Sequence, residues 1–223
     1  MNIVPRIDNL CKKFVLSDVP FAENVIERNE SLAVKMGDKI VVYVNNKKDF
    51  TSDDIKKIKS IKNICGDYQS LIKLGIAANK IELGELMYTN KSYSDNSAIV
   101  CNNIKDISDA SNICKEAGIA DNEDVNILFD DCKNKKTLIA LFRLNGQPCG
   151  TARANFVNNK VIIGGVATAQ KYRGKGFGKI ALEKVLHEEA GEVYLFVCNP
   201  IAKNMYEKMG FITICTWGRV VGN

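Results

Sequence analysis

The segment from residue 173 to residue 178 contains three glycines, and this composition suits the binding of an anion. It follows an apolar stretch and precedes a helical pattern whose apolar residues, between positions 181 and 186, share one face. Glycines let the backbone approach a ligand closely, and the free N–H groups of a helix's first turn lie at the positive end of its dipole. The segment therefore predicts a turn that can hold a pyrophosphate without any particular side chain.

The spacing of these glycines excludes two other phosphate-binding motifs. In a nucleotide P-loop the second glycine follows the first by five positions, whereas Gly178 follows Gly174 by four. A P-loop also needs Ser or Thr after its lysine, whereas Ile180 follows Lys179. The dinucleotide motif GxGxxG would need a glycine at Lys179. The strand expected before the turn also belongs to an antiparallel meander, which disfavours a parallel dinucleotide-binding fold.

A second pattern consists of Asn199, Ala202, Tyr206 and Gly210. Asn199 comes at the end of an expected strand, where it can cap the next helix, and a proline follows it at the position that suits a first turn. Ala202 and Tyr206 are four residues apart and share a helix face. A tyrosine hydroxyl can supply a proton to a leaving group, and a small residue at 202 leaves room for a ligand.

Both patterns resemble those of the GNAT superfamily of N-acetyltransferases, whose turn reads Arg/Gln-x-x-Gly-x-Gly/Ala. The resemblance covers about residues 97–217. It implies that acetyl-CoA (CoA) is the co-substrate, that Tyr206 is the general acid for the departing thiolate, and that no metal takes part. The residues implied in cofactor binding, through the turn, the strand before it and the second pattern, are Val166, Ala167, Thr168, Arg173, Gly174, Lys175, Gly176, Phe177, Gly178, Asn199 and Ala202.

The same resemblance implies an α/β (α+β) fold with a mixed, mostly antiparallel central sheet flanked by helices. We expect this GNAT domain at residues 97–223, a smaller N-terminal α/β domain at 1–92 and a polar linker at 89–97. The N-terminal part looks like a degenerate GNAT-like extension and contains no G-x-G, so we expect no second CoA site in it. The segment after Gly210 is shorter than the two strands that usually end the family's fold.

Periodicity and turn signals predict the elements that position these motifs. In the first half, Ser52 is the expected cap of a helix that carries Ile55, Ile58, Ile61 and Ile64 and ends at Gly66. The other elements expected there are strands at 31–35, 39–44 and 81–88 and a helix at 70–74. Those expected in the second half are strands at 98–101, 137–144, 149–157, 160–168, 192–198 and 211–217, and helices at 104–117, 123–132, 176–190 and from 200 to 210.

Composition limits the classes of function. The net charge of +5, from 31 basic and 26 acidic residues, comes without a basic stripe, so we expect no nucleic-acid partner. One histidine and eight cysteines without CxxC spacing argue against a zinc site. The absence of a signal segment and of a membrane-length apolar run favours a reduced cytoplasmic protein, as a monomer or homodimer with no membrane partner.

No general base stands out. Asp130 and Asp131 are typical of a solvated helix end, His187 of a surface position, and Cys198 of a buried strand residue. The acceptor is an amine-bearing small molecule or peptide that the sequence does not name. Two alternatives stay open: a non-catalytic acyl-CoA-binding module, and a structural interaction protein. CoA binding separates the last from the others, and turnover over a panel of amines separates the first two.

Overall fold

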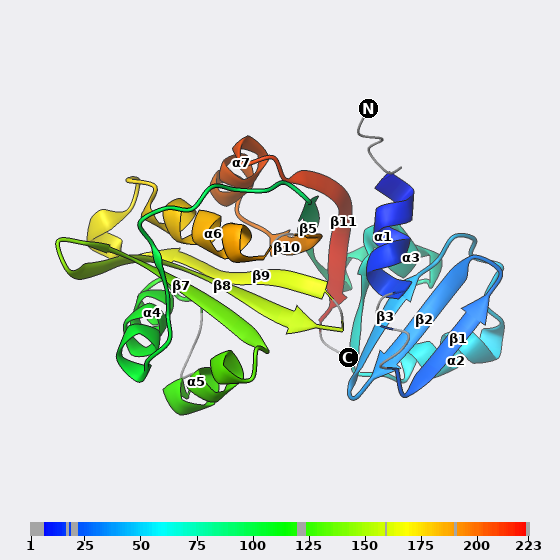
Figure 1. Cartoon of the computed structure of the whole chain (residues 1–223). Helices are drawn as coiled ribbons and strands as arrows, with labels where there is room; N and C mark the ends of the chain where they lie inside the picture. The colour runs from blue at the N-terminus through cyan, green and yellow to red at the C-terminus, as the bar shows by residue number, and fades with distance from the viewer. Residues whose placement is uncertain are drawn as a thin grey trace. The chain divides into compact units, whose positions relative to one another are not determined.

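The computed structural model describes residues 7–16, 18, 22–119, 124–158, 160–189 and 191–221 (Figure 1). The chain divides into two compact units. Unit 1 is Met1–Met87, Phe196–Glu207 and Phe211–Asn223, and unit 2 is Tyr88–Leu195 and Lys208–Gly210. The C-terminal part of the chain therefore contributes to both units. None of the described helices is long and apolar enough to cross a membrane.

Unit 1 is built around strands in the order β1-β2-β3-β4-β11-β5. Its elements are α1 (Ile7–Leu16), β1 (Asn24–Arg28), β2 (Ser31–Met36), β3 (Lys39–Tyr43), α2 (Ser52–Lys59), β4 (Asn63–Asp67), α3 (Tyr68–Lys73), the 3₁₀ turn η2 (Ala78–Lys80), β5 (Ile81–Thr89), α7 (Pro200–Lys208) and β11 (Ile212–Val220). β5 and α7 each continue into unit 2 at their last residues. The hairpin expected around positions 36–38 is confirmed by the antiparallel register of β2 and β3.

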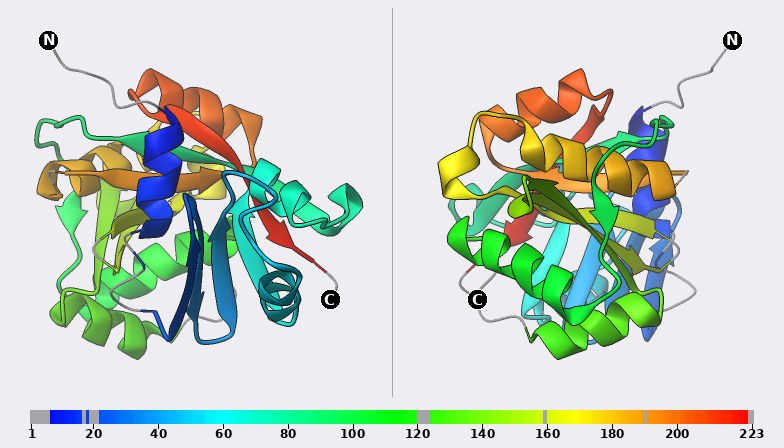
Figure 2. Two further views of the ribbon diagram at one scale, coloured as in Figure 1. Left: turned by 90° about the vertical axis from the view of Figure 1, so that its right-hand side faces the viewer. Right: turned by 60° about the vertical axis from the view of Figure 1, so that its left-hand side comes forward.

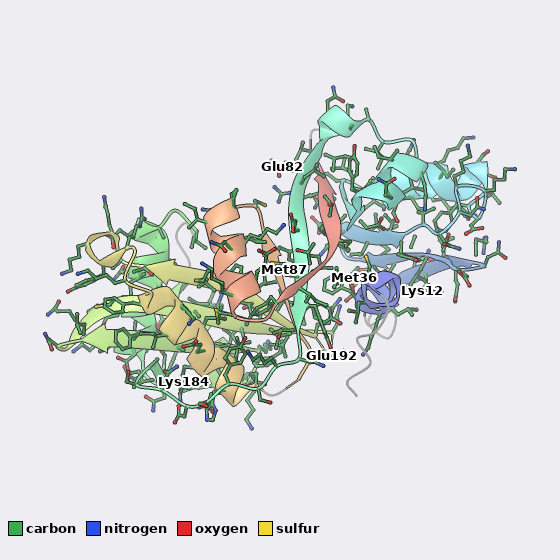
Figure 3. The ribbon with its side chains drawn as sticks, turned by 90° about the horizontal axis from the view of Figure 1, so that it is seen from above. Lys12, Met36, Glu82, Met87, Lys184 and Glu192 are labelled. Carbon is green, nitrogen blue, oxygen red and sulfur yellow. The ribbon has the colours of Figure 1, made fainter. Side chains whose placement is uncertain are left out.

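The short C-terminal segment forms a single strand, β11, in the sheet of unit 1. It pairs antiparallel with β4, where Gly218 lies opposite Gly66, and its other neighbour is β5. Figure 3 shows β11 beside β5, which the labels of Glu82 and Met87 mark. Strands from the first ninety residues therefore take the places beside the last strand of the chain.

The helix expected from Ser52 forms, but its cap and its length differ from the prediction. Thr51 is the cap: its hydroxyl accepts from the Asp54 N–H, and the Asp54 carboxylate accepts from the Thr51 N–H in return. The helix ends at Lys59, so Ile61 and Ile64 lie outside it. Ile64 is instead buried in β4, where a β-branched side chain packs well.

Gly66, the expected end of that helix, lies inside β4. A Cβ at this position would come within 2.5 Å of the Val42 carbonyl oxygen on β3. The glycine therefore permits the close parallel pairing of β3 and β4, and its role is packing rather than termination.

Unit 2 contains a mixed sheet in the order β10-β9-β8-β7-β6. Its elements are β6 (Ile99–Val100), α4 (Ile104–Glu116), α5 (Val125–Lys133), β7 (Thr137–Leu144), β8 (Gln147–Val157), β9 (Lys160–Thr168), the 3₁₀ turn η3 (Gln170–Tyr172), α6 (Phe177–Glu188) and β10 (Val193–Val197), the last of which ends in unit 1. Only β9 and β10 are parallel among these pairs. Helix α6 covers one face of the sheet, and α4 and α5 cover the other (Figures 1 and 2).

The meander expected in the second half is confirmed. Asn145 and Gly146 both have positive φ, at 52° and 78°, as the tight turn between β7 and β8 requires. Three expected positions, Glu123, Asn159 and Ala190, fall outside the described residues. The fold class is therefore α/β with a mixed sheet flanked by helices, as the sequence predicts.

Candidate functional site

The glycine-rich turn leads from β9, through η3, into the first turn of α6. Gly174 and Gly176 have φ angles of 77° and 80°, in the left-handed region that favours glycine. Nothing lies within 4 Å of the Cβ positions of either residue. The turn is therefore shaped by glycine and open on the side that these two residues present.

The N-terminus of α6 offers backbone donors to this open side. The N–H of Gly178 donates to the Thr168 hydroxyl at 3.0 Å, which anchors the helix start to the end of β9. No described residue accepts from the N–H groups of Gly176 and Phe177. Because these donors lie at the positive end of the helix dipole, they suit a pyrophosphate.

Two glycines allow α6 to start this close to the sheet. A Cβ on Gly178 would lie 2.9 Å from the Thr168 hydroxyl oxygen and 3.0 Å from the Ala167 carbonyl oxygen. A Cβ on Gly150, in β8, would lie 2.3 Å from the Phe177 carbonyl oxygen. Sequence reasoning missed Gly150, although a glycine inside a strand pattern is a signal for close backbone approach.

Aromatic side chains pack against Phe177, the first residue of α6. The Phe177 ring lies 5.0 Å from the Phe142 ring and 5.9 Å from the Tyr172 ring, measured between centroids. Phe177 therefore uses its side chain for packing, and its backbone remains for a ligand. Arg173 and Lys175 are exposed, and the Lys175 ammonium lies 5.7 Å from the centre of the Tyr172 ring. This side of unit 2 is thus positively charged.

β9 changes its pairing just before the turn. Its register with β10 covers three pairs and ends at Ile163, whereas β9 itself continues to Thr168. Gly165 has a φ of 61°, close to the point where the register with β8 shifts. Beyond Ile163, β9 pairs with β8 and with no other strand among the described residues, and this part includes the half-buried Val166. The other edge can pair with an extended ligand.

The second pattern lies on α7, in unit 1. The Asn199 side-chain oxygen accepts from the N–H of Ile201 at 2.8 Å and of Ala202 at 3.4 Å, so the predicted cap is confirmed. This cap uses the amide oxygen of Asn199 and leaves its NH₂ group as a donor. Ala202 is half-buried one turn before Tyr206.

Tyr206 is held by packing. Only 7% of its surface is exposed, and its ring contacts the Phe211 ring edge-on, with centroids 5.7 Å apart. Its carbonyl oxygen accepts from the Phe211 N–H at 3.0 Å, and Gly210, with a φ of 94°, makes the bend between them. Within the described ranges the hydroxyl has no hydrogen-bonding partner. Burial raises the pKa of the phenol to about 12, so the hydroxyl keeps its proton.

A groove of about 360 Å³ lies beside the start of α7 within unit 1. Its lining residues come from β5, the end of β10 with the two residues after it, α7 and β11: Leu83, Gly84, Glu85, Val197, Cys198, Asn199, Pro200, Lys203 and Thr216. The Glu85 carboxylate accepts from the Lys203 ammonium at 2.8 Å and from the Thr213 hydroxyl at 2.6 Å. These hydrogen bonds lower the pKa of Glu85, which is therefore ionised at neutral pH.

Cys198 does not lie where the sequence predicts it. It was expected inside a strand, but β10 ends at Val197 and Cys198 is exposed in the groove. A Cβ on Gly84 would lie 2.8 Å from its sulfur, so the glycine makes space for the thiol.

The other candidate residues are surface groups, as expected. Asp130 is exposed, and Asp131 lies 3.8 Å from the Lys136 ammonium. His187 is exposed and shares a group of possible metal ligands with Asp95 and Glu188, whose ligand atoms lie within 4.8 Å of one another.

A lysine of the protein lies beside two of these possible metal ligands. The Lys184 ammonium lies 2.7 Å from carboxylate oxygens of both Asp95 and Glu188 (Lys184 is labelled on α6 in Figure 3). The lysine therefore offsets part of the negative charge of these carboxylates, and the group gives no reason to infer a metal.

The candidate residues thus form two groups. The turn at 173–178 and the end of β9 at 166–168 lie together in unit 2. Asn199, Ala202 and Tyr206 lie together on α7 in unit 1.

Comparison with known proteins gives a family match for part of the chain. The sequence profile of the acetyltransferase (GNAT) family matches residues 104–211, a span that includes both patterns. None of the curated proteins compared with the chain matches it.

Solved structures of two acetyltransferases and of one protein of unknown function share the fold. A GCN5-related N-acetyltransferase from Kribbella flavida is 12% identical with a TM-score of 0.64, over 96% of each chain. An acetyltransferase of the GNAT family from Colwellia psychrerythraea is 12% identical with a TM-score of 0.56, over 99% of this chain and 97% of that one. A functionally unknown conserved protein from Staphylococcus epidermidis is 13% identical with a TM-score of 0.55, over 94% and 97%.

At these identities the structural likeness concerns the fold alone, and the family match carries the assignment. Residues 104–211, a little under half of the chain, are therefore assigned to the acetyltransferase (GNAT) family.

Proposed function

We propose that this protein is an N-acetyltransferase that moves an acetyl group from acetyl-CoA directly to an amine. The observation that carries the proposal is the start of α6, where the Cβ positions of two left-handed glycines are open and the N–H groups of Gly176 and Phe177 have no acceptor among the described residues. Such a helix start binds anions through backbone donors and the dipole. It suits the pyrophosphate of acetyl-CoA, and the exposed Arg173 and Lys175 add positive charge.

The proposed contacts of the remaining cofactor follow from the groups left available. The edge of β9 at 166–168, beyond its register with β10, would hydrogen-bond the amides of the pantetheine arm. The NH₂ group of Asn199 would donate to a carbonyl of that arm, since only its oxygen is used in capping. Ala202 would leave room for the arm beside the helix.

In the proposed reaction, the amine nitrogen attacks the thioester carbon, a C–N bond forms and the C–S bond breaks. Tyr206 would donate its hydroxyl proton to the departing sulfur, because burial keeps the phenol neutral. The proton lost by the amine would pass to water, and water would return a proton to the Tyr206 phenolate, so that CoA leaves as the free thiol. The acceptor is an amine-bearing small molecule or peptide. We also propose that residues 97–223 form the functional domain and that an N-terminal domain at 1–92 precedes it in the sequence, since the family match lies within residues 97–223.

Two measurements test this function. Calorimetric titration with CoA should show binding, and acetyl-CoA with a panel of amines, amino acids and peptides should release free CoA in the presence of at least one acceptor. Binding without turnover over a broad panel would support the non-catalytic acyl-CoA-binding module instead. No binding of CoA would leave only a structural role for this fold.

A further inference from the structure

Two thiols that are distant in the sequence meet within unit 1. The sulfur atoms of Cys11, on α1, and Cys215, on β11, lie 3.2 Å apart although 204 positions separate them. Neither cysteine is joined in a disulfide. Cys11 is 4% exposed, and Cys215 is half-buried. One thiol of the pair is therefore enclosed, and the other is accessible to a small reagent.

Aromatic contacts fix the position of this pair. Phe14 lies one helical turn after Cys11, and Trp217 lies two residues after Cys215, so each ring shares a face with its cysteine. The Phe14 ring contacts the rings of Trp217 and Phe196 edge-on, with centroid distances of 5.2 and 5.8 Å. The same packing that attaches α1, which Lys12 marks in Figure 3, therefore keeps the two sulfurs close.

The two sulfur atoms are close to the separation of a disulfide. Disulfide sulfurs lie about 2.05 Å apart, so the pair must approach by about 1.2 Å, which small side-chain rotations can supply. We propose that Cys11 and Cys215 are a modification site, at which a low-molecular-weight disulfide such as oxidised glutathione converts the two thiols into a disulfide between α1 and β11.

The reaction has two exchange steps. The Cys215 thiolate attacks a sulfur of the small disulfide, forms a mixed disulfide and releases one small thiolate. The Cys11 thiolate then attacks the Cys215 sulfur, closes the protein disulfide and releases the second small thiolate, and both small thiolates take up the protons that the two cysteines lost. The two cysteines lose two electrons in total, and the small disulfide gains them.

The experiment uses the full chain with oxidised glutathione, followed by alkylation of remaining thiols and mass spectrometry of intact protein and peptides. The chain has eight cysteines. The oxidised protein should contain a Cys11–Cys215 cross-linked peptide and no lasting glutathione on either residue. Cys198, which is exposed, is the internal comparison, and it should keep its glutathione as a mixed disulfide.

Two variants and one denatured control make the test specific. Cys11→Ala should leave glutathione attached to Cys215, because the resolving thiol is gone, whereas Cys198→Ala should leave the cross-link intact. In concentrated urea, the equilibrium constant for forming this cross-link with glutathione should fall roughly 100-fold or more, because only the folded chain holds the sulfurs together.

The cross-link should also raise the melting temperature of the oxidised protein by several degrees. If Cys11→Ala proves unstable, Cys215→Ser, at the more accessible position, provides the same comparison from the other side and should carry no glutathione at Cys11. Lasting glutathione on Cys215 of the folded wild-type chain, or an equal equilibrium constant in urea, would overturn the proposal.

Discussion

At the scale of single residues, Tyr206 carries the sharpest prediction. Replacing Tyr206 by Phe keeps the ring that packs against Phe211 and removes only the hydroxyl. If this proton goes to the leaving thiolate, kcat should fall by roughly 10²-fold or more, the usual share of acid–base catalysis. The affinity for acetyl-CoA should change little. Steady-state kinetics beside a binding titration checks this. A variant with near-normal kcat would return Tyr206 to a packing role.

The raised pKa of Tyr206 predicts the shape of the pH profile. A general acid must be protonated, and burial moves the pKa of this phenol from its ordinary value of 10 upward to about 12. The acid form therefore persists through the range in which an exposed tyrosine would start to ionise. Measured from about pH 7 to about pH 10, kcat should show no decline from loss of this proton. A basic limb that is present in the wild type and absent in Tyr206→Phe would contradict this assignment.

Local chemistry was predictable at this scale, and long-range proximity was not. The cap by Asn199 depends on residues within three positions of it, so the sequence predicts it correctly. The exposure of Cys198 depends on where β10 ends, and the prediction of a buried residue was wrong. The approach of Cys11 to Cys215 depends on how α1 packs on β11, and no local pattern carries that information.

At the scale of elements, the turn before α6 can be tested through Gly176. Valine at this position must adopt a φ of 80°, which a β-branched residue strongly disfavours, and its side chain would fill the open side of the turn. Calorimetry should show that CoA binding is lost, while circular dichroism shows a folded protein. Gly37→Val, in the turn between β2 and β3, is the matched control, since Gly37 also has a positive φ, at 57°, and nothing lies within 4 Å of its Cβ position. Unchanged affinity in Gly176→Val would refute the turn as the CoA site.

The close approach of α6 to β8 at Gly150 gives a prediction about stability. In Gly150→Ala, the added methyl would lie 2.3 Å from the Phe177 carbonyl oxygen, so the start of α6 must move. The free energy of unfolding should fall by roughly 1–3 kcal/mol, as for other overpacked sites, and CoA should bind more weakly. Gly191→Ala should change neither quantity. Chemical denaturation and titration of both variants provide the check, and a Gly150→Ala protein as stable as the wild type would show that α6 moves freely.

Most of the expected helices and strands were predicted with the correct type. The prediction that the helix continues over residues 61–66 was wrong, and the cause is clear. Isoleucines at 55, 58, 61 and 64 repeat every three residues, which looks like one helix face. The helix in fact ends at Lys59, because Ile64 finds a buried place in β4 beside β3. The hairpin at Asn145 and Gly146 was predicted correctly, since its dihedral angles are a property of the two residues themselves.

At the scale of the whole molecule, we expect one CoA per chain. In each of the two helices of residues 52–73, one amide of the first turn is occupied by a side chain from the chain itself. Thr51 accepts from the Asp54 N–H at the start of α2, and Asp67 accepts from the Ser70 N–H at the start of α3. Titration should therefore give a stoichiometry of about one. Two equivalent sites per chain would show that a further anion site exists outside the turn at 173–178.

The place of β11 between β4 and β5 also bears on how the protein is made. A ribosome releases β4 and β5 long before β11, so during synthesis each of these strands exposes unpaired backbone groups on the side that β11 will later cover. Unit 1 can therefore finish folding only after residues 212–220 have left the exit tunnel. Until then the nascent chain presents two open strand edges, and strand-binding chaperones have a defined interval in which to protect them.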